Sequence, residues 1–181
     1  MQATTCMALV LIVVSGLLVG CATAPASRAE RETLLAEAAS TLKRMSAEAP
    51  EVSALVRRGH GYALFPTVTK GGLVVGGARG QGVLYEQGRH IAYCDLTQAT
   101  VGAQVGGQTF SELLVFESKA ALDRFRAGQL TFAADASAVV LKTGVAADFS
   151  FIDGVAVVVS PIGGAMVEAA VGGQQFTCQA R

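Results

Sequence analysis

The 181-residue chain contains no tryptophan, only 6% aromatic and 15% charged residues, and its formal net charge is zero. Because it has no basic excess with which to bind nucleic acid non-specifically, we expect no nucleic-acid partner. Its apolar runs also fall short of the roughly 20 residues that a membrane-spanning helix needs. What the chain does have is 21 glycines and a hydrophobic content of 51%. This composition excludes a disordered chain and indicates a closely packed backbone.

Motifs typical of enzymes and metal sites are missing from the sequence. It has no Cys-x-x-Cys, His-x-x-x-His or Gly-x-Ser-x-Gly arrangement, and its two histidines, His60 and His90, lie far apart. The glycine-rich segment 71–82 has neither the spacing of a dinucleotide fingerprint nor the Lys-Ser/Thr of a phosphate loop, and a strand pattern follows it. We therefore expect no enzyme activity, no metal and no cofactor. A pocket that gathers His90, Cys94 and Asp95 would reopen the question of catalysis.

The N-terminal segment has the pattern of an export signal. A short apolar run over residues 8–19 is followed by small residues and Cys21, which indicates a cleaved signal peptide and not a membrane span. Leu18-Val19-Gly20-Cys21 resembles the lipobox of bacterial lipoproteins. The resemblance implies that residues 1–20 are removed, that Cys21 carries acyl chains, and that residues 21–27 form a lipidated tether. An ordinary secretory peptide is the alternative, and residues 1–7 carry none of the Lys or Arg usual in such signals.

The cysteines agree with export to an oxidising compartment. Cys6 would be lost with the signal and Cys21 acylated, which leaves Cys94 and Cys178 in the mature chain. Both lie in strand-like segments, so a disulfide between the last strand and an inner strand is one interpretation. Two buried free thiols are the other. Since Ala22 is not the Asp that marks inner-membrane retention in enteric bacteria, we expect a location at the outer membrane, facing the periplasm.

Residues 28–181 are expected to form one α+β domain that begins with helices. Apolar residues at three- and four-residue steps predict a helix over 28–49, followed by a short helix over 51–58. A further short helix is predicted over 119–127. The first helix could pack on a sheet or lie on the bilayer beside the lipid anchor. Its narrow, alanine-rich apolar face favours packing on the sheet.

Strand patterns fill most of the remaining chain. Three Val-Gly-Gly sequences suggest strands that bend or pack closely at equivalent points. Because no long helices separate the strands, we expect a glycine-rich, mainly antiparallel sheet that is curled or closed into a small barrel, with the N-terminal helices packed on it. The separate strands predicted after the hairpin turn at 86–89 are His90–Asp95, Gly102–Gln108, Glu112–Glu117, Val155–Ser160, Met166–Val171 and Gln174–Gln179.

Several sequence blocks resemble one protein family. Residues 59–77, from Gly-His-Gly-Tyr-Ala-Leu-Phe-Pro to Gly-Gly-Leu-Val-Val-Gly-Gly, resemble the opening of the SYLF domain, a lipid- and actin-binding domain in eukaryotes. The following block, 80–84, continues the resemblance. Later blocks of the family are matched in order by Phe125-Arg126-Ala127-Gly128, Asp135-Ala136-Ser137-Ala138-Val139 and Gly144. The resemblance extends over about residues 40–179, nearly the whole predicted mature chain.

The resemblance to the SYLF domain implies phospholipid binding. Eukaryotic members bind phosphoinositide membranes and some bind actin, whereas bacterial members are typically lipoproteins or exported proteins. Actin does not transfer to a bacterial envelope, so membrane phospholipids with anionic headgroups are the expected partner. His60 replaces a common family lysine, Lys70 keeps the other, and Arg57, Arg58 and Arg79 are further candidate headgroup ligands. The alternative is a structural or partner-binding envelope protein that contacts the membrane only through its lipid anchor, with a protein partner that the sequence does not identify.

Overall fold

The computed structural model describes residues 25, 27–130, 138–141 and 147–181. The predicted signal segment, Cys21 and most of the predicted tether lie outside these residues, as do Gly144 and most of the 135–139 block. In chain order the elements are α2 (Arg28–Glu48), α3 (Pro50–Arg58), β1 (Gly61–Gly72), β2 (Val75–Glu86), β3 (Arg89–Phe116), α4 (Lys119–Arg126), β4 (Ala138–Val140) and β5 (Val155–Ala180).

The helices form where the sequence predicts them, because each has a clear start and an apolar face. At the start of α2, Ser27 Oγ accepts a hydrogen bond from Glu30 N, and the Glu30 carboxylate accepts one from Ser27 N. Leu34, Ala38 and Met45 of α2 are buried in a core that α2 shares with α3 and one face of the sheet. The prediction that the first helix packs on the sheet is therefore confirmed.

The sheet is mostly antiparallel and strongly curled. Its strand order is β1-β2-β3-β5-β4, and β1 also pairs with β3. The first half of β3 pairs with β2, the second half pairs with β1, and β5 pairs along most of β3. Only β4 runs parallel to its neighbour, β5, among the pairings described. The α+β prediction is confirmed, and of its two forms the curled, non-closed sheet is the one observed.

The division into many short strands is wrong. β3 runs unbroken for 28 residues and β5 for 26, so each contains three of the strands predicted separately. The glycines bend the paired strands without ending them. Gly106 and Gly164 have φ values of 122° and 90°, and a Cβ on either would collide with a carbonyl of the opposite strand. Only glycine fits such a bend while the ladder continues across it.

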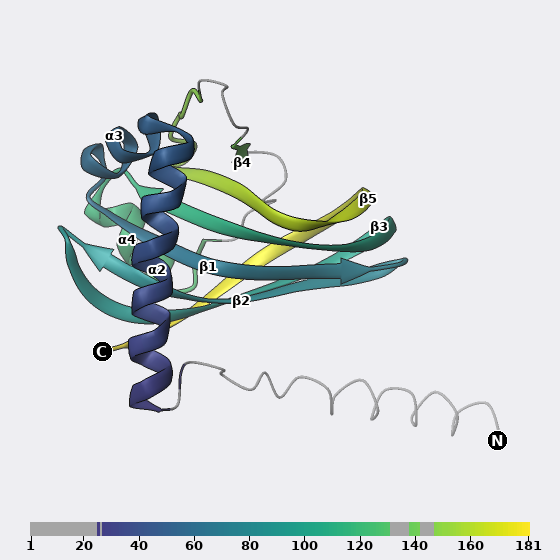
Figure 1. Cartoon of the computed structure of the whole chain (residues 1–181), viewed down its shortest axis with the longest axis horizontal. Helices are drawn as coiled ribbons and strands as arrows, with labels where there is room; N and C mark the ends of the chain where they lie inside the picture. Colours follow the sequence, from purple (N-terminus) through teal and green to yellow (C-terminus); the bar gives the residue numbers. More distant parts are fainter. Residues whose placement is uncertain (1–24, 26, 131–137, 142–146) are drawn as a thin grey trace, which may run out of the picture.

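Apolar side chains fill both faces of one end of the sheet. The inner core, inside the curl, includes Phe65, Phe116, Phe125 and Phe176, and α4 contributes to it. The outer core lies beneath α2 and α3. Figure 1 shows α2, α3 and α4 gathered at this end, which we call the helix end, while the turn between β1 and β2 and the middle parts of β3 and β5 project from the other.

A disulfide crosses the sheet within the strands that carry these cores. Cys94 of β3 and Cys178 of β5 lie directly opposite one another in the ladder, with Cα atoms 4.1 Å apart. Their sulfurs are bonded, so the last strand is linked to an inner strand and the two cysteines are not free thiols. The bond closes a loop of 84 residues by sequence separation.

Candidate functional site

The four predicted headgroup ligands lie in three separate places. Arg57 and Arg58 are in the last turn of α3, at the helix end, and both are exposed. The Arg58 guanidinium carbon lies 5.5 Å from the centre of the Phe151 ring, within the range of a cation–π contact. Lys70 is in β1 and Arg79 in β2, on opposite faces of the sheet. The structure therefore does not assemble them into one cationic site.

Lys70 lies inside the curl and not on the outer surface. Only 3% of it is exposed, and it lines a partly open cavity of about 150 Å³ together with Gln98, Glu112 and Gln174. Gln174 Nε2 donates a hydrogen bond to Glu112 Oε2 over 3.0 Å. In this position the Lys70 side chain belongs to a buried polar cluster on the inner face of the sheet, and it does not extend from the outer surface toward a lipid headgroup.

The direction of Lys70 follows from an irregularity in β1. Side chains alternate between the two faces of a strand, and Leu64 belongs to the outer core while Phe65 belongs to the inner core. The register with both neighbouring strands shifts between about residues 64 and 68. This bulge moves Val68 and Lys70 to the inner face, although their even spacing from Leu64 would place them outside.

Arg79 lies on the outer face, between two threonines. Thr69 of β1 and Thr97 of β3 are its direct partners in the ladder, and all three residues are exposed. We call them the Thr–Arg–Thr row. With Gly71 and Gly77 they line an open surface hollow of about 570 Å³. A guanidinium flanked by two hydroxyl groups offers several hydrogen-bond donors and a fixed positive charge, which suits the oxygens of a phosphate group.

Beyond this row, the projecting end of the sheet is apolar. Leu73 and Val74 form the turn between β1 and β2, and Val75 begins β2. Each of the three is 68% exposed, and Val101 and Val105 of β3 are 63% and 64% exposed. We call these five residues the apolar tip. Sequence reasoning missed it, because it interpreted the 71–82 segment as close strand packing. The signal that was available is the absence of any charged residue over 71–78 and over 96–111.

The apolar tip is held in place by buried contacts. Gly102 N donates to Val74 O and Gln104 N donates to Leu73 O, both over 2.9 Å. Behind the tip, Thr100 Oγ1 donates to Gln104 Oε1 over 2.9 Å, and both side chains are buried. A Cβ on Gly76 would collide with the Gln104 side chain. The exposed aliphatic groups are therefore presented by a packed strand end with satisfied backbone groups.

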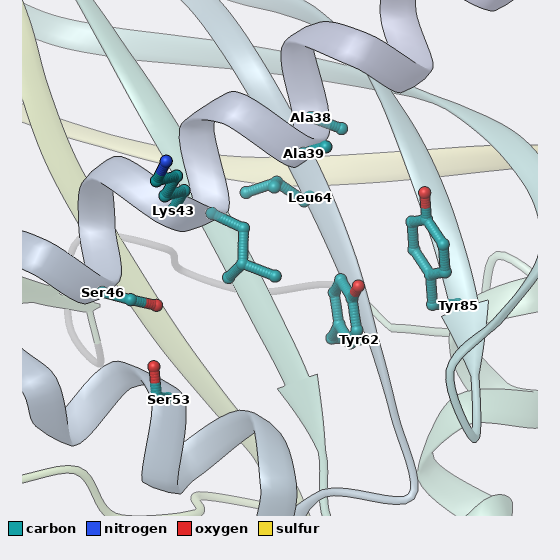
Figure 2. A pocket seen from close by; sticks show the side chains of 9 residues that line it. Ala38, Ala39, Lys43, Ser46, Ser53, Tyr62, Leu64 and Tyr85 are labelled. Carbon is teal, nitrogen blue, oxygen red and sulfur yellow. The ribbon is translucent and has the colours of Figure 1, made fainter.

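A groove beneath α2 is the other hollow of note (Figure 2). It has a volume of about 440 Å³ and lies between α2, α3 and the hairpin of β1 and β2. Tyr62 and Tyr85 stack at its floor with ring centres 4.9 Å apart, and Ser46 and Ser53 point toward one another across it. Burial, with a smaller effect of Tyr85, raises the pKa of Tyr62 to about 12. The Tyr62 hydroxyl therefore stays protonated at neutral pH. Among the residues that line the groove, Lys43 carries a charge.

The residues considered for catalysis are held in structural contacts. His90 Nε2 lies 3.0 Å from the carbonyl oxygen of Ala92, and burial lowers the pKa of its ring. Cys94 is in the disulfide and carries no thiol. His60 Nε2 lies 2.9 Å from Glu86 Oε1 at the helix end. Within the described ranges, no three His, Cys, Asp or Glu side chains gather in a way that could hold a metal ion.

Comparison with known proteins gives no further information on this site. In the part of the chain that the structure covers, no helix is long and apolar enough to span a bilayer. The hypothesis of lipid binding depends on the sequence resemblances and on the surface formed by the Thr–Arg–Thr row and the apolar tip. A search of protein-family models gave no match to this chain, and no curated protein matched it either.

Proposed function

We propose that this protein is a lipid-anchored protein of the outer membrane, facing the periplasm, whose SYLF-like domain binds phospholipids with anionic headgroups. The observation that carries the proposal is the position of Arg79, an exposed cation between two exposed hydroxyl groups in a surface hollow. The lipobox at Cys21 and the ordered SYLF-like blocks support the same assignment from the sequence.

Arg79 is preferred to the other predicted cations for a physical reason. Lys70 is almost fully buried on the inner face of the sheet, and Arg58 is placed against the Phe151 ring at the helix end. Arg79 combines free access with neighbouring donors, so it can bind a phosphate with more than one hydrogen bond. An arginine near an anionic membrane surface contributes about 1 kcal/mol to binding, which corresponds to roughly fivefold in affinity.

Co-sedimentation of the unacylated domain with vesicles tests this proposal. The chain from Ala22 keeps every described residue, including both cores, and it lacks the acyl anchor that would bind any vesicle. We expect tighter binding to phosphatidylcholine vesicles that contain phosphatidylglycerol than to phosphatidylcholine alone. Arg79→Gln should weaken binding to the mixed vesicles by about fivefold.

Arg89→Gln is the matched control, because Arg89 is also exposed but begins β3, beside the hairpin turn at the opposite end of β2. This variant should bind as the unchanged chain does. Equal binding to both kinds of vesicle, with no effect of Arg79→Gln, would remove the proposed headgroup site. A complete absence of binding would instead favour an envelope protein that contacts the membrane only through its anchor.

A further inference from the structure

The outer face of the sheet changes in steps from the Thr–Arg–Thr row to the apolar tip. Next to the row, Gly71 of β1 pairs with Gly77 of β2, and Ala99 follows on β3. After these small residues come the exposed aliphatic side chains of the tip. A membrane surface has the same sequence of layers, with charged phosphates, then a narrow interface, and then hydrocarbon.

The spacing of these layers also fits. Val75 lies four residues beyond Arg79 in β2, and a strand rises by about 3.3 Å per residue, so the two are about 13 Å apart along the strand. With Arg79 at the phosphates, the end of the sheet would reach through the interface into the upper part of the hydrocarbon. Amphipathic helices that lie on membranes bury their apolar face to a comparable depth, about 5–10 Å.

A bilayer is a better occupant for this surface than a second copy of the chain. Partners in a stable protein complex bury about 800 Å² each, which is more than five aliphatic side chains can supply. A bilayer needs no such minimum, since each buried methylene adds about 0.8 kcal/mol. Moreover, the predicted tether of Ala22 to Ser27 spans at most about 20 Å, so the anchored domain always remains close to the membrane surface.

We infer that the apolar tip inserts into the lipid bilayer, with the Thr–Arg–Thr row at the level of the phosphates and the helix end held away from the membrane. This inference rests on the proposed function and deepens it. It identifies which surface contacts lipid. Insertion of the tip adds a hydrophobic contribution to binding, whereas binding through headgroup charge alone would be sensitive to salt. Binding then depends on how easily the lipid surface admits aliphatic side chains, as well as on its charge.

An environment-sensitive dye at the tip tests insertion directly. The chain from Ala22 has no free cysteine, because Cys94 and Cys178 are bonded, so Val74→Cys can be labelled selectively with nitrobenzoxadiazole. The matched control is Ile152→Cys, since Ile152 is 51% exposed and neighbours the first residue of β5 near α4. On phosphatidylcholine–phosphatidylglycerol vesicles, the label at residue 74 should brighten, shift to the blue and be quenched by brominated acyl chains, while the label at residue 152 should not respond.

An unlabelled variant, Leu73→Gln with Val75→Thr, gives a second measurement. Because both residues are exposed, its thermal unfolding should match that of the parent, and its vesicle affinity should fall by about tenfold. Normal vesicle binding with a water-exposed label at residue 74 would overturn insertion and leave the proposed headgroup binding in place. Loss of self-association in this variant, with unchanged vesicle affinity, would assign the tip to a second copy and also overturn the inference. If the parent binds no vesicles, the proposed function itself fails.

Discussion

The two ends of the same sheet are built in opposite ways. At the helix end, both faces are covered, and large apolar side chains such as Phe65, Met45 and Leu55 are almost fully buried. At the other end, the outer face is bare, the neighbouring residues are mostly glycine, and Leu73, Val74 and Val75 are exposed. The same strands run through both ends (Figure 1). The ends differ because α2, α3 and α4 pack on the sheet at the helix end, whereas the other end is rich in glycine and exposes aliphatic side chains.

This contrast separates stability from function. Burial of apolar side chains stabilises the helix end, where each buried leucine contributes on the order of 2 kcal/mol. Exposed aliphatic side chains at the tip contribute little to folding and reduce solubility, so their presence on an ordered strand end calls for a binding role. The predictions below test this division, from the largest expected change to the smallest.

Removing the disulfide should cause the largest loss of stability. Replacing both Cys94 and Cys178 by Ser frees a loop of 84 residues, and loop-closure entropy for that length predicts a loss of about 4.5 kcal/mol. Urea unfolding of the double variant from Ala22, compared with the oxidised parent, measures the change. Reduction of the parent should give a similar loss. If the variant unfolds at the same urea concentration as the parent, the disulfide does not stabilise the helix end of the sheet.

Truncating a leucine in the outer core should have the next largest effect. Leu55 of α3 is 1% exposed, so Leu55→Ala loses its burial and leaves a cavity, at a cost of about 3 kcal/mol. The matched control is Leu73→Ala, which makes the same substitution at the apolar tip. It should change stability by less than about 0.5 kcal/mol. Equal losses of stability from both variants would contradict the proposed division between the two ends.

A polar network that fastens α2 to the sheet should matter less. The Arg44 guanidinium donates to Ser160 Oγ over 2.6 Å, to Ser111 Oγ over 2.8 Å and to Glu48 Oε1 over 2.9 Å. Because Arg44 is partly exposed, we expect Arg44→Ala to lower the free energy of unfolding by about 1–2 kcal/mol. Arg44→Lys keeps the charge but loses the planar fork, so its loss should be intermediate. Urea unfolding of both variants provides the comparison.

How far the sequence predicts this structure differs between the same two ends. The helices were predicted to within about one residue, because their apolar residues recur at three- and four-residue steps and Pro50 separates the first two. The capping box at Ser27 is a feature that the structure adds. The long strands were not predicted, since a glycine can end a strand or bend it, and the outcome depends on the strand paired opposite. Gly106 and Gly164 bend β3 and β5 together and keep them paired.

The candidate site was only partly predictable for a similar reason. Arg79 was among the predicted cations, and it lies on the accessible face. Lys70 was also predicted, but the bulge in β1 moves it to the inner face. Pro66 lies within the bulge, and a proline inside a strand that is paired on both sides is typical of a bulge, a signal that sequence reasoning did not use. The apolar tip was missed because apolar residues are normally assigned to the core. Their exposure becomes visible only when the neighbouring strands are in place.

The smallest expected change in stability is therefore the most informative about function. Val101→Thr and Val105→Thr keep the β-branched shape that suits a strand but replace one methyl group with a hydroxyl group at each position. Both residues are exposed, so the double variant should unfold within about 0.5 kcal/mol of the parent. Its vesicle affinity should nevertheless fall several-fold, because aliphatic surface no longer enters the hydrocarbon. Val140→Thr, at an exposed residue of β4 outside the tip, is the control. If the tip variant and this control bind vesicles equally well, the two ends of the sheet do not differ in function.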